Sequence, residues 1–379
     1  MSNVVVVGAD HHNTLGVVES LAEKGIRPYV ILHTKSRHSF ILHSKNVQKG
    51  WRCKDESDII KTLTENLKTS ESKTIIIATS DCAACILDKN YSLLEPYFIV
   101  PTVKAAGSLE RVMSKESMSS VAKKCGMNVP SSWIMKDGKI PEGIQYPVIT
   151  KAISSVEGGK GDIKVCYRQK DLEDYLRENH CQSIQLQQFI NKQFEFQLLG
   201  CSLNSGEEII IPGRTNIDRP NGMDNTFFLS FDKCEEELDS LVEKAKAFVR
   251  LSQYTGPFSI EFLRDKNGID YFTEMNFRND GNAYCVTKSG TNIPYIYYLY
   301  NSGGDYKSEL EKSQVRKVWL MPEVYYTSCL FKREFGLKEW WRNMRKSTCY
   351  TTYYSNDKAP FFFFLVWAVL KRITSTKSR

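Results

Sequence analysis

The sequence predicts a protein of mixed α/β and α+β class, in which a parallel sheet covered by helices is followed by a region of strands and helices of a second kind. Two segments predict the parallel sheet. Residues 4–7 form an apolar run that leads through a turn into a helix, and residues 74–78 begin the same pattern again. The second region is marked by residues 274–278, where polar and apolar side chains alternate as they do in a strand with two different faces.

The elements of the first part follow from this pattern. An apolar run without alternation fits a strand that is buried on both faces, as in a parallel sheet. Glycine next to a basic residue is a common helix end, and the chain has Lys24 and Gly25 after its first helical stretch. We therefore expect strands at residues 4–7, 29–32, 74–78 and 98–100, with helices from the first turn to about residue 24 and from residue 81 through residue 87.

The first turn limits what the parallel sheet can bind. Residues Gly8 to Asp10 contain neither the Gly-x-Gly-x-x-Gly pattern of dinucleotide sites nor the lysine of a phosphate-binding P-loop, so neither site is expected here. His11 and His12 lie in the same turn and could contact a substrate. The favoured alternative is that they are solvated or cap the following helix.

Composition sets further bounds. The chain has 379 residues, of which 41% are hydrophobic and 25% charged, as in a globular protein of two or three domains. The N-terminus lacks the features of a signal peptide, and the eleven cysteines form no framework, so we expect a cytoplasmic location with reduced thiols. Cys82 and Cys85 form a Cys-x-x-Cys pair without partners at zinc spacing, which favours helix packing over metal binding.

Hard oxygen ligands gather on two neighbouring predicted strands. Glu274, Asn276 and Arg278 share one strand face, and the turn at residues 265–268 folds Glu261 back beside them. Magnesium prefers carboxylates together with substrate phosphates, so this pattern predicts a Mg²⁺ site with a cation beside it. A hairpin whose outer face is merely acidic is the plain alternative.

A second pattern predicts phosphate binding. A strand at residues 146–151 ends in Lys151 and is followed by a loop of small residues and then by another strand. Glycines let backbone amides approach a polyphosphate, and a loop without bulky groups can close as a lid. Without the lysine, the loop could be a plain hairpin turn. Lys115, in the first turns of a helix over residues 111–124, supplies another cation. The loop residues expected to contact phosphate are Ser154, Ser155, Gly158, Gly159 and Gly161.

With these motifs the sequence resembles the ATP-grasp superfamily, whose metal site is an acid followed about a dozen residues later by Glu-x-Asn-x-Arg. The resemblance implies ATP as cosubstrate, with Mg²⁺, or Mn²⁺ as an alternative, on Glu261, Glu274 and Asn276. It also implies phosphate contacts from Lys115 and Lys151. Residues 184–190 resemble the hinge strand that reads adenine, with a ribose contact following. The implied nucleotide contacts are Gln187, Gln188, Phe189, Ile190 and Glu195. Relatives commonly have glutamate where this chain has Gln187, which keeps an acceptor oxygen but loses the charge.

The expected catalytic residues are cations. Arg278 would face the transferring phosphoryl group or the oxyanion, and Lys151 would neutralise phosphate charge. One of Arg214 and Arg219, with Arg214 preferred, would face the γ-phosphate or the acyl substrate. Arg214 could equally be a surface arginine. Such chemistry depends on positioning and positive charge rather than on a protein nucleophile.

The resemblance covers most of residues 1–300 and is nearest to amino-acid and peptide ligases related to D-aspartate ligase. It implies a Rossmann-like domain at residues 1–104, an ATP-grasp domain at residues 105–304 with its lid at about residues 130–190, and a basic helical extension at residues 305–379. The implied activity is ADP-forming carboxylate–amine ligation through an acyl phosphate, on an amino acid or a cell-envelope or polysaccharide precursor. Phosphoryl transfer to a hydroxyl and a membrane-associated, non-catalytic nucleotide-binding scaffold are the alternatives. Small-molecule carboxylates and amines are the expected partners, and related ligases are often homodimers.

The net charge of +7 is concentrated in the extension. Residues 331–379 hold eleven cations and three acids, which leaves the rest of the chain with a net charge near −1. We therefore expect no nucleic-acid groove in that part. Leu337, Trp340, Trp341 and Met344 lie at helical spacing, and residues 361–370 are apolar. Two alternatives remain: an anchor on the inner, anionic membrane surface, or helices packed on the body of the protein, which is favoured.

Overall fold

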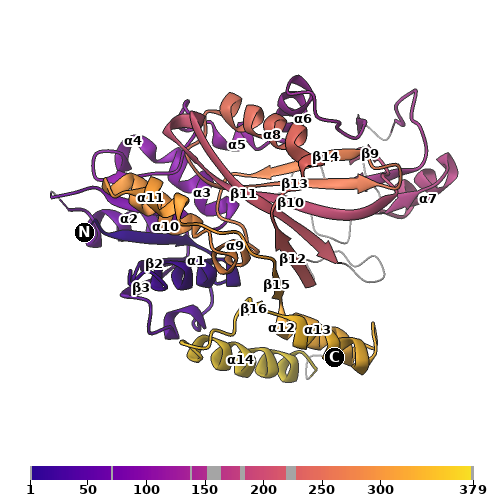
Figure 1. The fold of residues 1–379 in the computed structure, drawn as a ribbon. Helices are drawn as coiled ribbons and strands as arrows, with labels where there is room; N and C mark the ends of the chain where they lie inside the picture. Colours follow the sequence, from indigo (N-terminus) through magenta and orange to yellow (C-terminus); the bar gives the residue numbers. More distant parts are fainter. Residues whose placement is uncertain are drawn as a thin grey trace. The chain divides into compact units, whose positions relative to one another are not determined.

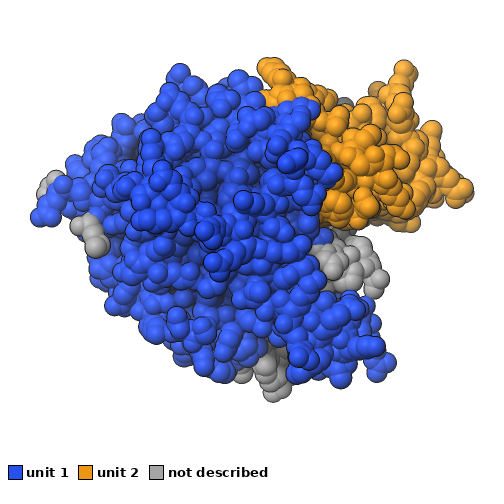
Figure 2. Space-filling model, viewed as in Figure 1, with its two compact units in different colours: residues 1–113, 196–261, 275–379 blue, residues 114–195, 262–274 orange. Residues whose placement is uncertain are grey.

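The computed structural model describes residues 2–69, 71–136, 139–151, 164–179, 184–218 and 228–376, with side chains to Trp367 in the last helix. Figure 1 shows the helices and strands. The chain divides into two compact units (Figure 2). Unit 1 contains residues 1–113, 196–261 and 275–379, and unit 2 contains residues 114–195 and 262–274. The polypeptide therefore passes between the units four times.

The first sheet of unit 1 is parallel, as expected. Its strand order is β3-β2-β1-β4-β5, and every residue of β1 and β4 is buried. Polar side chains begin the helices that follow: the side chain of His11 accepts a hydrogen bond at the start of α1, and Ser80 does the same for α3. The elements of this sheet are β1 (Val4–Gly8), α1 (His12–Ala22), β2 (Tyr29–His33), η1 (Ile41–His43), β3 (Lys49–Cys53), α2 (Glu56–Asn66), β4 (Thr74–Ala78), α3 (Asp81–Lys89), α4 (Tyr91–Leu94), β5 (Phe98–Ile99) and α5 (Leu109–Val112).

A seven-stranded sheet has the order β14-β13-β10-β11-β12-β15-β16. The chain makes the predicted turn between β13 and β14, where Asp265 and Ile269 are hydrogen-bonded through their backbones at 2.9 Å. The elements are β10 (Lys192–Leu203), η3 (Asn204–Gly206), β11 (Glu208–Asp218), β12 (Phe228–Asp232), η5 (Glu236–Leu238), α8 (Asp239–Ser252), β13 (Gly256–Asp265), β14 (Asp270–Asn276), α9 (Tyr284–Ser289), α10 (Ile293–Ser302), α11 (Tyr306–Glu311), β15 (Val318–Met321) and β16 (Cys349–Tyr350).

Unit 2 contains a four-stranded sheet of order β6-β9-β7-β8. Its core consists of Val148, Leu172, Ile184, Leu186 and their neighbours, which pack α7 against the sheet. The predicted helix over residues 111–124 is instead two helices, because Ser114 has extended backbone angles and caps the second. The elements are α6 (Lys115–Lys124), β6 (Ser132–Met135), β7 (Val148–Lys151), β8 (Val165–Cys166), α7 (Gln169–Asn179) and β9 (Ile184–Gln188).

The C-terminal segment packs on the body of unit 1. One hydrophobic cluster joins Val6 and Leu15 of the first sheet and its helix to Tyr297, Leu320 and Tyr354, far along the chain. The segment also contributes β15 and β16, which sequence analysis did not predict because they are short and lie between helices. Its helices are α12 (Glu323–Phe331), α13 (Leu337–Lys346) and α14 (Ala359–Thr376).

The apolar stripe predicted on α13 is divided. Trp340 and Met344 pack against a buried cluster around Tyr326, whereas Leu337 and Trp341 are 66% and 58% exposed. Asn343, between them, is buried and donates a hydrogen bond to the Tyr326 hydroxyl at 2.6 Å. Among the described residues, no helix is both long enough and apolar enough to cross a bilayer.

The carboxyl of Glu19 on α1 predicts a pH effect on stability. Burial is the main cause that raises the pKa of Glu19 to about 8, with Asp357 adding to it and the Asn46 amide opposing it at 3.0 and 3.1 Å. The unfolded chain releases this proton near pH 4.3, so the folded state holds an extra proton from about pH 5 to 8. Stability should therefore fall as pH rises through this window, by a few kcal/mol at most.

Glu19→Gln should remove this dependence, because the amide resembles the protonated acid. Urea unfolding at pH 5.5 and 8.5 measures the effect, with Glu65→Gln on the exposed surface of α2 as the control. We expect the Glu19 variant to be more stable than the parent protein at pH 8.5. An equal loss of stability in both variants would contradict the assignment.

Candidate active site

The carboxyl ends of β1 and β4 form the natural binding position of the first sheet. After β1 the chain continues to β2 on one side, and after β4 it continues to β5 on the other. In open parallel sheets, ligands bind where the strand order reverses in this way. His11 follows β1, and Asp81 follows β4 as the first residue of α3. Both side chains are exposed at this position.

The segment after β14 is bound to this same place by buried amides. Asn13 donates hydrogen bonds to the carbonyls of Thr79 at 2.8 Å and Asn279 at 2.6 Å. In return, the Asn279 amide donates to the Asn13 side-chain oxygen at 2.7 Å. Both amides are nearly inaccessible to solvent, so they fix residues 279–282 against the strand ends rather than offering a free binding group.

Arg278 lies at the centre of a group of hydrogen bonds, which we call the Arg278 network. Its guanidinium donates to Asp81 at 3.1 Å, to Asp280 at 3.3 Å, to the side-chain oxygen of Asn276 at 2.9 Å and to the carbonyl of Asn279 at 3.2 Å. Burial lowers the pKa of Arg278, but Asp81 and Asp280 outweigh burial and the net shift is upward. Arg278 is therefore a fixed positive charge with a set orientation.

Glu261 and Asn276 lie together, as the predicted hairpin requires. The Asn276 amide nitrogen is 3.3 Å from a carboxylate oxygen of Glu261, and it also donates to Ser259 at 3.0 Å. Gln197 on β10 donates to the same Glu261 oxygen at 2.9 Å, and its own oxygen accepts from Asn282 at 2.9 Å. Neighbouring strands therefore hold the Glu261 carboxylate in one orientation.

The donor types fit a hard divalent cation. Glu261 offers carboxylate oxygens, and the Asn276 oxygen, which accepts one hydrogen bond from Arg278, has a second lone pair. Within the described ranges, no group of three or more His, Cys, Asp or Glu side chains is arranged as a metal cluster. Glu261 and Asn276 could therefore supply two oxygen ligands to magnesium, an ion that usually completes its coordination with water and substrate phosphates.

Unit 2 contains the third predicted metal ligand and a lysine. Glu274 is exposed on β14, two residues before Asn276. Lys115 is the first residue of α6, after the Ser114 cap. Burial lowers the pKa of Lys115, and the negative charge of Glu274 opposes that shift. These two predicted residues are thus within electrostatic reach of each other.

Lys151 and the hinge strand lie in the small sheet of unit 2. β9 is central in this sheet, with Gln187 opposite Ser132 of β6 and Ile149 of β7, and Lys151 opposite Gln185. Lys151 is the last residue of β7 and is half-buried. The sheet therefore brings the lysine and the predicted adenine strand side by side. The predicted loop residues Ser154, Ser155, Gly158, Gly159 and Gly161 lie outside the described residues.

Backbone hydrogen bonds hold the end of the hinge strand in place. Gln188 donates to the carbonyl of Ser131 at 2.8 Å, and Phe189 donates to that of Pro147 at 3.0 Å. Ile190 is buried, and Glu195, at the predicted ribose position, forms an ion pair with Lys192. The backbone N–H groups of Gln188 and Phe189 donate hydrogen bonds within unit 2. Other groups of the hinge would therefore have to form the hydrogen bonds to adenine.

Arg219 lies outside the described residues, whereas Arg214 lies on β11. Its guanidinium lies 3.2 Å from Glu235 and over the ring of Phe196. Phe196 and Gln197 are consecutive on β10, so their side chains point to opposite faces of the sheet, and Arg214 lies on the face of Phe196. A role for Arg214 in catalysis remains a prediction.

The two histidines pack against residues 279–282. The capping alternative is confirmed for His11, whose ring nitrogen Nδ1 accepts a hydrogen bond from the backbone N–H of Asn13 at 3.3 Å. Although His11 is partly exposed, the atoms packed around its ring remove enough water to lower its pKa, and the charge of Arg278 adds to that shift. Burial lowers the pKa of His12 further. A Cβ on Gly281 would lie only 3.0 Å from the His12 ring, which explains glycine at this position.

Sequence analysis missed four residues that orient the site: Asp81, Gln197, Asp280 and Asn282. Gln197 gave no signal, because a glutamine on a mostly apolar strand is common. Asp81 could have been found from its position directly after a buried parallel strand, where ligand-binding residues gather. Asp280 and Asn282 could have been found from the run Asn279 to Asn282, where three of four residues are polar and lie soon after the metal strand.

Lys151→Ala should weaken ATP binding about tenfold or more, because a cation beside a polyphosphate in a partly buried place contributes more than about 1 kcal/mol. Calorimetric titration with ATP and magnesium measures the change. Lys139→Ala, at an exposed position of unit 2, is the control and should bind as the parent does. Equal affinity of the Lys151 variant and the parent would remove the lysine from the nucleotide site.

The parallel domain, the seven-stranded sheet, the small four-stranded lobe and the Glu-x-Asn-x-Arg strand define an ATP-grasp protein, a class whose members couple ATP cleavage to ligation or carboxylation. Residues 110–300, half of the chain, match the family model of the carbamoyl-phosphate synthase L chain, ATP binding domain. The chain belongs to this family. No curated protein shows a significant sequence match.

Three solved structures have the same fold. L-amino acid ligase from Bacillus licheniformis matches with a TM-score of 0.64 and 17% identity, over 84% of this chain and 79% of that one. N5-carboxyaminoimidazole synthetase from Staphylococcus aureus complexed with ADP gives 0.67 and 15%, over 89% and 87%. The biotin carboxylase domain dimer of 2-oxoglutarate carboxylase from Hydrogenobacter thermophilus, with MgADP, ADP and bicarbonate, gives 0.64 and 17%, over 84% and 74%. At these identities the likeness shows the fold alone.

Proposed function

We propose that the protein is an ATP-dependent, ADP-forming carboxylate–amine ligase that activates its carboxylate substrate as an acyl phosphate. The observation that carries the proposal is the orientation of Arg278, fixed between Asp81 and Asp280 beside Glu261 and Asn276. A rigid cation next to hard oxygen ligands is what transfer of a phosphoryl group to a carboxylate requires.

Each residue has a role in this scheme. Lys115 and Lys151 offset phosphate charge, and the hinge residues Gln187 to Ile190, with Glu195, hold the nucleoside. Arg278 stabilises the oxygens of the transferring phosphoryl group and then the oxyanion formed when the amine attacks the acyl carbon. The amine loses a proton during that attack, and neutral His11, beside Arg278, can accept it. Phosphate leaves with the bonding electrons of the acyl–oxygen bond.

Glu261, Glu274 and Asn276 would hold magnesium, with manganese as an alternative ion. Such an ion neutralises charge on the phosphate oxygens. The rest of the scheme depends on the chain itself, since Gln197 and Asn282 fix the Glu261 carboxylate and Asp81 fixes the Arg278 fork.

The position of the network favours a small polar substrate. Arg278 provides positive charge for a carboxylate, while Asp81 and Asp280 provide negative charge for an ammonium group, all at the carboxyl ends of β1 and β4. An amino acid carries both groups. The substrate is therefore an amino acid, or a cell-envelope or polysaccharide precursor that contains one. ATP supply and the unpaired cysteines of the described part fit a cytoplasmic reaction. A homodimer is the proposed assembly.

Hydroxylamine trapping tests the proposal. The protein is incubated with ATP, magnesium, an amino-acid library and hydroxylamine, and the products are measured by mass spectrometry together with ADP. An acyl phosphate reacts with hydroxylamine to give a hydroxamate, so we expect ATP-dependent hydroxamate from one substrate group. A stable phosphoester in its place would show phosphoryl transfer to a hydroxyl. Absence of any ADP formation with the full library would favour a nucleotide-binding scaffold.

A further inference from the structure

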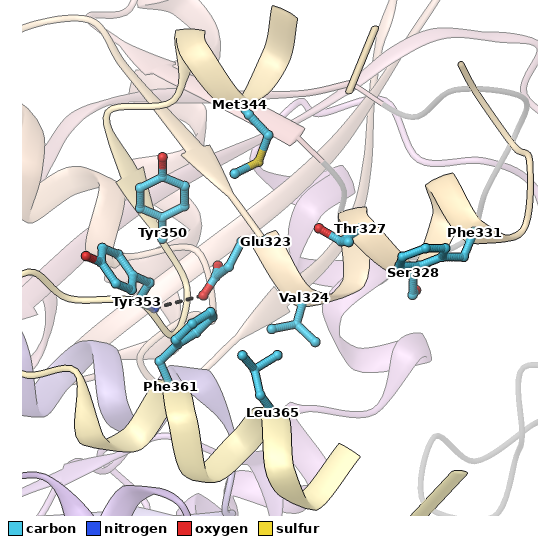
Figure 3. Close-up of a pocket in the computed structure, with 10 residues that line it drawn as sticks. All are labelled: Glu323, Val324, Thr327, Ser328, Phe331, Met344, Tyr350, Tyr353, Phe361 and Leu365. Atoms are coloured by element: carbon cyan, nitrogen blue, oxygen red, sulfur yellow. Dashed lines mark hydrogen bonds between the residues drawn. The ribbon is translucent and has the colours of Figure 1, made fainter. Parts of the chain in front are cut away.

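A cavity of about 590 Å³ lies within the C-terminal part of unit 1 (Figure 3). Its volume is within the range of small-molecule sites. Helices α12, α13 and α14 and the segment after β16 surround it, and it lies apart from the Arg278 network along the chain. The lining residues are Glu323, Val324, Thr327, Ser328, Phe331, Met344, Tyr350, Tyr353, Phe361 and Leu365.

The cavity accepts apolar groups. Val324, Met344, Phe361 and Leu365 give it an apolar wall. The one acid, Glu323, is not available to a ligand, because its carboxylate accepts hydrogen bonds from the backbone and hydroxyls of Thr351 and Thr352 and from the Tyr353 amide. The hydroxyls of Thr327 and Ser328, which also line the cavity, are hydrogen-bonded to Trp340 and to the carbonyl of Tyr325 respectively. A charged ligand would therefore meet no free group of opposite charge among these lining residues.

Apolar side chains also cover the outside of the same helices. On α14, Phe361 and Leu365 line the cavity, while their neighbours Phe362 and Val366 are each 57% exposed. Phe331, at the end of α12, lines the cavity and is 73% exposed. Helix α14 is held in this orientation, since Phe364 packs on Phe40 at 4.9 Å between ring centres. The exposed face is thus a fixed feature of unit 1.

Cations surround these apolar groups. Lys332 and Arg333 follow Phe331 directly and are exposed. On α13, exposed Leu337 and Trp341 are flanked by Lys338, Arg342 and Arg345, all exposed. As residues 331–379 hold eleven cations and three acids, this part of the protein would attract an anionic surface.

We propose that this surface, defined by the exposed residues of α12, α13 and α14, docks on a membrane containing anionic lipids, with one lipid acyl chain entering the cavity. Exposed aromatic side chains with lysines and arginines beside them are typical of interfacial membrane helices. A second copy of the chain is a poorer occupant, because it would bring the same basic residues together. The proposal is independent of the ligase chemistry, so it can fail without affecting the proposed function.

Vesicle flotation with the full chain tests the docking. We expect binding to phosphatidylcholine vesicles that contain phosphatidylglycerol, and little binding to phosphatidylcholine alone. The triple variant Lys338→Glu, Arg342→Glu, Arg345→Glu should lose at least about a hundredfold in affinity, because each cation near an anionic surface contributes roughly fivefold and charge reversal adds to the loss. The matched control Lys45→Glu, Lys54→Glu, Lys61→Glu reverses exposed lysines of the parallel domain and should keep most of the binding. An equal loss of vesicle affinity in both variants would show that binding depends only on the net charge of the protein, and it would overturn the proposed surface.

Two measurements test the acyl chain. Leu365→Trp should fill the cavity and weaken vesicle binding severalfold, provided that circular dichroism and thermal unfolding match the parent. Brominated acyl chains should quench the tryptophan fluorescence of the parent protein, which tests the proposal even if the variant misfolds. Unchanged binding in a folded Leu365→Trp variant, or no quenching, would overturn entry of the chain. Self-association without vesicles that Leu365→Trp abolishes would assign the surface to a second copy instead.

Discussion

Glu274→Gln is expected to lower turnover by at least about a hundredfold and leave the fold intact. The substitution removes one negative charge from the predicted magnesium site, and a single lost electrostatic contact to a developing transition-state charge typically costs two to three orders of magnitude. Since Glu274 is exposed, its side chain adds little to packing and the melting temperature should barely change. Steady-state ADP release, measured over a range of magnesium concentrations, is the assay.

A matched control separates the site from the surface. Glu236→Gln removes the same charge at an exposed position in η5 and should retain full turnover. We also expect Glu274→Gln to require more magnesium, and this readout would not change if the residue acted only through folding. Full ATP-dependent activity of Glu274→Gln at the parent's magnesium concentration would remove Glu274 from the metal site.

Arg278→Lys should have a large effect on both catalysis and stability. Lysine keeps the charge, but it cannot reproduce the fork that contacts Asp81, Asp280 and Asn276 together. Turnover should fall about a hundredfold to a thousandfold because the positive charge is no longer fixed. Stability should also fall, by as much as about 3 kcal/mol, because Asp280 is buried and loses part of its partner. The measurements are turnover and urea unfolding on the same preparations.

Arg264→Lys provides the control for stability. Arg264 forms a similarly buried pair, with two contacts to Asp270 at 2.7 and 2.8 Å, and both side chains are 14% exposed. This variant should lose stability to a similar degree with much less effect on turnover. If both variants lost turnover in proportion to stability, Arg278 would be a structural residue and the proposed role would fail.

The sequence was sufficient for the parallel domain because its signal is local. Residues 4–7 and 74–78 are apolar without alternation, and only strands covered on both faces require that pattern. The hairpin of β13 and β14 could also be predicted from the sequence, since Asp265 to Gly268 has the composition of a turn. Alternation of side chains along the two strands then places Asn276 near Glu261, as observed. Both inferences depend on neighbours in the chain.

Other features could not be read in this way. Asp81 and Arg278 are almost two hundred positions apart, and no local pattern indicates their contact. The division of the α13 stripe into buried Trp340 and exposed Trp341 depends on where the Tyr326 cluster lies. The cavity beside it has lining residues from three helices, the strand β16 and the segment after it, so its existence depends on how these segments pack.

The sequence alone predicted the type of chemistry, because carboxylate, amide and cationic side chains at strand spacing limit what a site can bind. It also indicated several strands and helices through the periodic placement of apolar residues, but it missed β15 and β16 and joined α5 to α6. Only the tertiary structure decided which of these groups meet. The Arg278 network and the C-terminal cavity each join segments that are distant in sequence, and such contacts form only when the chain buries its apolar surface in a single arrangement.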